Sequence, residues 1–344
     1  MVSLTRLALG LAAVVALAPS AALAFGDKEV SRSTKFGGSC QKCELSGRKL
    51  SNAQFLGANF QEAALVGTDL RGARFQGSNF SRADLSRADL SDANMVGANF
   101  SGANLSHARL RSVEMQGIVF AGANLTRADL SDGEAAGGNF SRAEMPSATL
   151  RSMEMQGGMF QDANLVKADL SDSEAQAANF SRARLTGARF RSAELQHASF
   201  ARAQASGADF QDSELTAANL SGGHFDKASF RSAELNYANL SGGSFVGADF
   251  RDADLRRASI EGVDLSHARG LTQDQLDEAC GDSRTRAPVG MVVRACSHGV
   301  RLIMRRERAV PAIKAVPAMP AVPPVPAVPA LPAPRYLVAA GDND

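Results

Sequence analysis

The sequence has almost no excess of charge, since 37 lysines and arginines are balanced by 36 acidic residues and the formal net charge is +1. The chain therefore lacks the generalised basic field that holds proteins to nucleic acid, and we expect no nucleic-acid partner. After the first 24 residues it also lacks any apolar run long enough to cross a bilayer. We expect no transmembrane segment in the mature chain.

Residues 1–24 have the layout of a secretory signal peptide. Arg6 precedes an apolar run, Leu7–Ala18, and the small-residue sequence Ala-Leu-Ala follows at 22–24. The alternative to a signal peptide is an N-terminal membrane anchor, but an apolar run of 12 residues is short for a membrane span. The sequence thus predicts export, with the mature protein periplasmic or secreted.

Cysteine is scarce, with four residues in the whole chain. In an oxidising compartment an even number predicts disulfides, and spacing suggests Cys280 with Cys296 and Cys40 with Cys43. Cys40 and Cys43 also have the C-x-x-C spacing of a redox pair, but the surrounding βαβ pattern is missing, so we favour a structural pair. The chain lacks convergent metal ligands and catalytic groups, and we expect no enzyme activity, metal or cofactor.

Proline is nearly absent between residues 45 and 265, where Pro146 is one of the chain's 12 prolines. This interval instead repeats every five residues. Each fifth residue from Leu45 to Leu265 is a candidate core position, and 42 of the 45 are Leu, Phe, Met or Ile. The residue two places earlier is usually small, and the two residues after the core position are typical of turns. Each pentad therefore predicts one short strand and one corner.

A slower repetition indicates how many strands close one coil. The segments RSVEM at 111, RSMEM at 151 and RSAEL at 191 recur every 40 residues, with related segments midway between them. If residues that resemble each other stack, one coil contains four strands and 20 residues. Phe140, Phe160 and Phe180 then belong to one stacked column.

The tandem A-[DN]-[LF]-x-x pattern resembles the pentapeptide-repeat proteins over about residues 43–269. The resemblance implies an all-β fold, a right-handed quadrilateral β-helix, with large and small residues inside. At roughly 20 residues a turn, this solenoid has about 11 coils. Some relatives are cytoplasmic dimers whose acidic rods bind DNA gyrase.

We expect five segments. Residues 1–24 are the signal peptide, 25–42 an N-terminal lead-in, 43–269 the β-helix, 270–300 a C-terminal cap with a disulfide, and 301–344 a basic and then Pro/Ala/Val-rich disordered tail. In the cap, Thr272 and Gln275 form a capping-box pattern that predicts a short helix.

One outward column is acidic and is our candidate interaction face: Glu114, Glu134, Glu154, Glu174, Glu194, Glu214, Glu234 and Asp254. A neighbouring row alternates in sign, and we expect each arginine there to lie between carboxylates of adjacent coils. A further column is rich in asparagine, whose amides we expect to hydrogen-bond along the stack.

These features favour a non-enzymatic, exported repeat protein with a structural or interaction role in the cell envelope and an unidentified protein or envelope partner. The alternatives are a DNA mimic that acts on gyrase and a thiol-disulfide protein that uses Cys40 and Cys43. The oligomeric state stays open, with a monomer as the first expectation.

Overall fold

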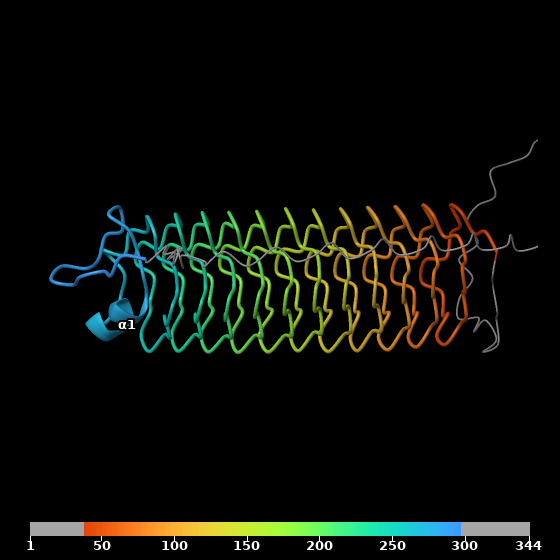
Figure 1. Cartoon of the computed structure of the whole chain (residues 1–344). Coiled ribbons are helices and arrows are strands. Elements are labelled where there is room, and N and C mark those ends of the chain that lie inside the picture. Colours follow the sequence, from red (N-terminus) through yellow and green to blue (C-terminus); the bar gives the residue numbers. More distant parts are fainter. Residues whose placement is uncertain (1–37, 297–344) are drawn as a thin grey trace, which may run out of the picture. The chain divides into compact units, whose positions relative to one another are not determined.

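The computed structural model describes residues 38–296, so the predicted signal peptide and tail lie outside the described residues. The described chain winds as a stack of coils in which each outward strand residue pairs with the one 20 positions further on (Figure 1). Parallel bridges run without a break from Ser39–Asn59 to Asp249–Arg269. The paired path therefore begins at Ser39, within the predicted lead-in at 25–42.

Residues 90–94 illustrate the hydrogen bonds of a pentad. The N–H groups of Leu90 and Asp92 donate to the following coil at 2.7 and 2.9 Å, and that of Asn94 donates to the preceding coil at 2.9 Å. Ala93 donates back to Leu90 at 3.0 Å and closes the corner. Because three of five N–H groups join coils, each coil depends on its neighbours.

Within the repeat, the first corner residue does not donate its N–H to the backbone of another coil. In the same pentad, the N–H of Ser91 donates to the side chain of Asp89 at 3.2 Å. Pro146 occupies this position and still accepts a bond from Arg127 N–H through its carbonyl at 3.1 Å. Proline is tolerated here because the missing donor is not part of the ladder.

The second corner residue adopts a left-handed conformation, with φ of 59° at Asp92 and 65° at Gly97. Glycine accepts this conformation without strain. Non-glycine residues hold it at 28 described positions, including arginine and lysine. The hydrogen bonds to adjacent coils therefore override the local preference of these residues.

The core is a filled interior of stacked side chains. Phe140, Phe160 and Phe180 are fully buried, and both steps between their ring centroids are 4.7 Å. This confirms the predicted phenylalanine column. Further along the chain the stack shifts to another wall, where the rings of Phe190 and Phe210 lie 4.9 Å apart.

Helix α1, Gln273–Glu278, covers the C-terminal end of the stack of coils (Figure 1). Thr272 is its N-cap, and the predicted capping box with Gln275 is present. The Gln275 Nε2 group also donates to the carbonyl oxygens of Phe250 and Ala253 at 2.9 and 2.8 Å. Leu276 is fully buried, so the helix shields the last coil from further strand pairing.

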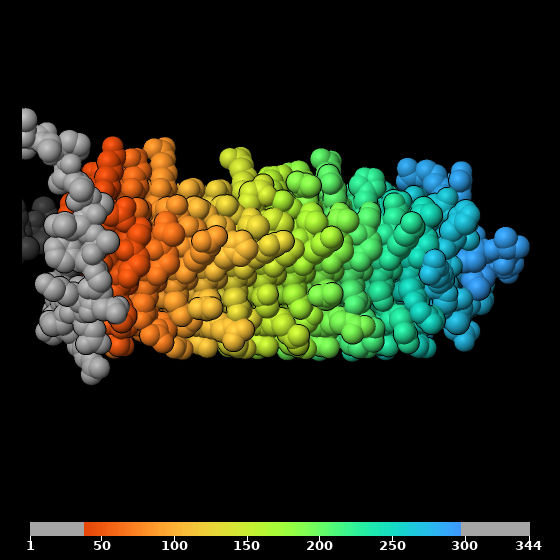
Figure 2. All heavy atoms as spheres, turned by 180° about the vertical axis from the view of Figure 1, so that it is seen from behind, coloured from red at the N-terminus to blue at the C-terminus, as the bar shows by residue number. Residues whose placement is uncertain are grey.

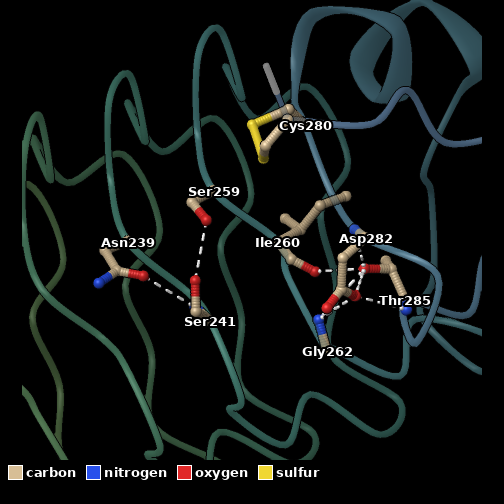
Figure 3. The surroundings of a disulfide bond; sticks show 9 residues. Asn239, Ser241, Ser259, Ile260, Gly262, Cys280, Asp282 and Thr285 are labelled. Carbon is tan, nitrogen blue, oxygen red and sulfur yellow. Dashed lines mark hydrogen bonds between the residues drawn. A yellow bond between two sulfur atoms is a disulfide. The ribbon is translucent and has the colours of Figure 1, made fainter. Parts of the chain in front are cut away.

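After α1 the chain pairs again with the preceding coil and is held by a disulfide (Figure 3). Cys280 pairs with Ser259, and its sulfur is bonded to that of Cys296. Asp282 and Thr285 then contact the preceding coil through Gly262 N–H and the Ile260 carbonyl. Among residues 38–296, no helix is long and apolar enough to cross a membrane.

Candidate interaction face

The acidic column forms a continuous line on one wall of the solenoid. Its members, which we call the carboxylate ladder, are linked by parallel bridges from each to the next: Glu114, Glu134, Glu154, Glu174, Glu194, Glu214, Glu234 and Asp254. Neighbouring backbones in such pairing lie about 4.8 Å apart. Eight carboxylates are therefore stacked at strand spacing, and like charges at this separation oppose folding unless they find donors.

Amide groups supply most of those donors. Gln116 and Gln156 each donate through Nε2 to the glutamate of the next coil, Glu134 at 2.6 Å and Glu174 at 2.8 Å. Gln176 donates to Glu194 at 2.5 Å. The same bond joins Gln196 to Glu214, and Asn94 donates to Glu114. Amides satisfy the oxygens without neutralising them, so the ladder keeps its negative charge.

Two members of the ladder receive no amide. The glutamine position is occupied by Ala136 before Glu154 and by Thr216 before Glu234. No side-chain hydrogen bond or ion pair joins either glutamate to any residue in the described part of the chain. The glutamine column was missed in the sequence, although its 20-residue spacing was a signal for it.

The arginines beside the ladder bind carboxylates of adjacent coils, but mostly not those of the alternating row. Arg111 binds Asp129 at 2.5 Å and Arg191 binds Asp209 at 2.6 Å, and both aspartates lie on the adjacent wall. Arg151 alone reaches an aspartate of the alternating row, Asp172, at 3.1 Å. The prediction of pairing with carboxylates of adjacent coils therefore holds for Arg111, Arg151 and Arg191, each with one carboxylate, and not for Arg231, which makes no ion pair within residues 38–296. The partners differ from one arginine to the next because the aspartates of the next wall are equally accessible to a long side chain.

Asp129 and Asp254 show how these pairs act on ionisation. Burial disfavours the charged form of Asp129, but hydrogen bonds from Ser131 and Arg111 outweigh it and lower the pKa of the carboxyl group. At the end of the ladder, burial is likewise outweighed by Arg256, so the pKa of Asp254 is lowered. Both groups stay ionised at neutral pH.

The asparagine column is organised mainly within pentads. Its side-chain oxygens accept bonds from the backbone N–H two residues later, as for Asn139 with Ser141 and Asn179 with Ser181, both at 3.0 Å. One amide bond between coils is present in this column, from Asn79 to Asn59 at 3.2 Å. The expected hydrogen bonding of these amides along the stack is therefore present at this one step within residues 38–296, because the turn N–H is the nearer partner elsewhere.

The cysteines form two disulfides in the structure. Cys40 and Cys43 are joined with a Cα–Cα distance of 5.2 Å, and the N–H of Cys40 already donates to Asn59 of the next coil at 2.7 Å. This pair thus lies in the first coil. Cys280 and Cys296 are joined within the cap. Residues 38–296 contain no group of three or more acidic, His or Cys side chains placed to hold a metal.

The surface hollows are open, and the one beside the ladder is lined mainly by polar groups. One of about 430 Å³ lies beside the ladder and is lined by Arg151, Asp172, Arg191 and Asp212 among others. Its three arginines are paired with Asp172, Asp169 and Asp209, while Asp212 accepts a hydrogen bond from Gln211. The hollow lacks a nucleophile beside a base. The space-filling view shows the coils following one another along the visible face (Figure 2).

The filled interior, four walls per coil and regular outward columns define a β-solenoid repeat protein. The model of the family described as pentapeptide repeats matches in overlapping copies from residues 39–77 to residues 233–269. The chain belongs to the pentapeptide repeat family.

Several solved structures are similar to the chain. HetL, involved in heterocyst differentiation regulation in the cyanobacterium Nostoc sp., is 30% identical, with 63% of this chain and 90% of HetL covered and a TM-score of 0.42. QnrB1, a plasmid-mediated fluoroquinolone resistance protein, is 19% identical, with 67% and 94% covered and a TM-score of 0.28. A search of curated proteins finds no significant match.

Proposed function

We propose that this chain is a non-enzymatic, exported repeat protein with a structural or protein-interaction role in the cell envelope, built on a right-handed solenoid of about 11 coils. The observation that carries the proposal is the contrast between the buried inward residues and the regular columns of outward residues. The large inward residues of the repeat, such as Phe160, are buried against one another, while outward residues form long uniform columns. Such a surface presents extended contact lines rather than a convergent pocket.

Cell fractionation combined with crosslinking tests this proposal. We expect the mature chain in the envelope fraction, with crosslinked partners recovered reproducibly. A variant that lacks residues 1–24 is the matched control and should stay in the cytoplasm. A cytoplasmic wild-type protein, or an envelope fraction that yields no reproducible partner, would contradict the role.

A second candidate function, action on DNA gyrase as a duplex mimic, is favoured by the carboxylate ladder. Its charges repeat about every 4.8 Å, compared with about 3.4 Å for the phosphates of one DNA strand. The predicted signal peptide, the neighbouring arginines and the capped C-terminal end weigh against it. A supercoiling assay decides, since no effect of the mature protein on gyrase would eliminate this function.

A thiol-disulfide role for Cys40 and Cys43 is the third candidate. Its support is the C-x-x-C spacing and the partial exposure of both residues. An insulin reduction assay with both residues changed to Ser tests it, and unchanged activity would dismiss it.

A further inference from the structure

The wall opposite the carboxylate ladder, together with the corner on each side of that wall, has an excess of positive charge. Residues half a coil apart, such as Glu174 and Arg184, lie on opposite walls, because 20 residues complete one coil. Between residues 111 and 234 this opposite side has seven cationic residues and three carboxylates. We call the seven the basic side: Arg127, Arg142, Lys167, Arg182, Arg184, Arg202 and Lys227.

The charges of the basic side are mostly unpaired. Arg182 binds Asp162 of the preceding coil at 2.7 Å. The other six members are exposed and make no ion pair or side-chain hydrogen bond with any residue from 38 to 296. Their charge is thus available to a partner.

The ladder side has the complementary excess over the same length of chain. Residues 111 to 234 place ten carboxylates there, seven from the ladder and three aspartates of the alternating row, against four arginines. Glu154 and Glu234 have no donor, and the remaining ladder glutamates keep their charge beside amides. The net charge of the chain is therefore near zero although its two sides have opposite charge.

We propose that the ladder side of one molecule binds the basic side of a second copy of this chain, so that solenoids associate side by side. Both sides have the repeat of about 4.8 Å set by the coil spacing, so charges on two aligned copies stay in step along the whole contact. A partner that is only acidic or only basic would complement one side of the molecule, whereas a second copy complements both. The inference extends the interaction role proposed above by naming one partner.

The contact is heterologous, because each copy uses a different surface. In a pair, one molecule retains a free basic side and the other a free acidic side, so association continues into an open lateral array. Exposed charges are screened beyond about 10 Å at 0.1 M salt, so the array should form at low ionic strength and separate at high ionic strength.

Analytical ultracentrifugation of the mature protein tests the proposal with two charge-reversed variants. The first, the ladder variant, combines Glu154→Lys, Glu174→Lys and Glu194→Lys. The second, the basic-side variant, combines Arg142→Glu, Arg184→Glu and Arg202→Glu. All six side chains face outward, and the backbone hydrogen bonds between coils do not involve them. Far-UV circular dichroism verifies that both variants fold.

We expect wild-type protein to form concentration-dependent oligomers at about 20 mM salt and to become monomeric at about 500 mM salt. Each variant alone should associate at least about tenfold more weakly, because like charges now meet. Mixed together, the variants should associate again, since the intact basic side of one meets the intact ladder of the other and the two altered patches are also of opposite sign.

Three outcomes would overturn the proposal: a wild-type protein that is monomeric at low salt, variants that still form oligomers alone, and a mixture that fails to pair. Binding of monomeric wild type to a polyanion or polycation would assign the charged sides to another partner. Because the sedimentation measurement is independent of cellular location, its failure is distinguishable from failure of the envelope role.

Discussion

Gln156 donates a hydrogen bond from Nε2 to Oε2 of Glu174 on the next coil, at 2.8 Å. Similar bonds from Gln116 and Gln176 recur along the stack. The donors lie at a corner and the acceptors on a wall, so each bond ties two coils together. A row of neutral donors thus allows like charges to stack without being neutralised.

Removal of this donor should destabilise the stack. We expect Gln156→Ala to lower the free energy of unfolding by about 0.5–1.5 kcal/mol, because Glu174 loses an amide partner beside other carboxylates. Ala136→Gln is the matched gain, since it places a donor before Glu154, and it should raise stability by a similar or smaller amount. Urea unfolding followed by circular dichroism measures both, and a neutral effect of both changes would contradict the role assigned to the amides.

Interruption of the phenylalanine stack should cost considerably more. Phe160→Ala leaves a cavity between Phe140 and Phe180 and is expected to lower stability by about 3–5 kcal/mol. Phe160→Leu should cost about 1 kcal/mol, since Leu220 and Leu240 occupy this column elsewhere. Hydrogen exchange should locate the loss in the coils around residue 160. Equal effects of the two variants would argue against tight packing there.

Loss of the C-terminal cap should expose the last coil. Gln275→Ala removes the donor to the carbonyls of Phe250 and Ala253 and half of the capping box. We expect faster exchange at residues 250–260 and concentration-dependent aggregation, measured by light scattering, because an open ladder edge accepts foreign strands. Asp274→Asn on the exposed first turn of α1 is the control and should aggregate no more than wild type.

The cap should also loosen in acid. Burial disfavours ionisation of Asp282, but hydrogen bonds from Arg284 and from the backbone N–H of Gly262 outweigh it and hold the pKa of the carboxyl group well below its usual value of 3.8. The unfolded chain therefore binds more protons than the folded chain as pH falls through that range. The stabilisation is complete above about pH 5 and is lost progressively at lower pH.

Hydrogen exchange of residues 258–290 measures this dependence. Protection in wild type should be constant from about pH 7 to pH 5, after correction for intrinsic rates, and should fall below about pH 4. Asp282→Asn should be less protected at neutral pH and should change less in acid. An identical acid response in the two proteins would remove Asp282 as the cause.

Side-chain partners were the part of the interaction face that the sequence predicted least well. The ladder positions follow directly from the 20-residue spacing, but Arg111 and Arg191 turn to Asp129 and Asp209 on the adjacent wall. A long arginine side chain at a corner reaches two walls, and the pattern of residues along one column does not choose between them. The Asp282 contacts were missed for a related reason, because their partner Gly262 is 20 residues away and outside any local motif.

The sequence by itself determined the period, the inward residues and the capping box at Thr272, because burial of one large and one small residue in every five leaves a single way to fold each pentad against its neighbours. Tertiary structure decided which charges pair and which remain free. It also decided that many corner residues other than glycine take a left-handed conformation, with φ of 58° at Arg142 and Lys167. Both outcomes depend on contacts between coils, and only the stacked chain brings those groups within reach of one another.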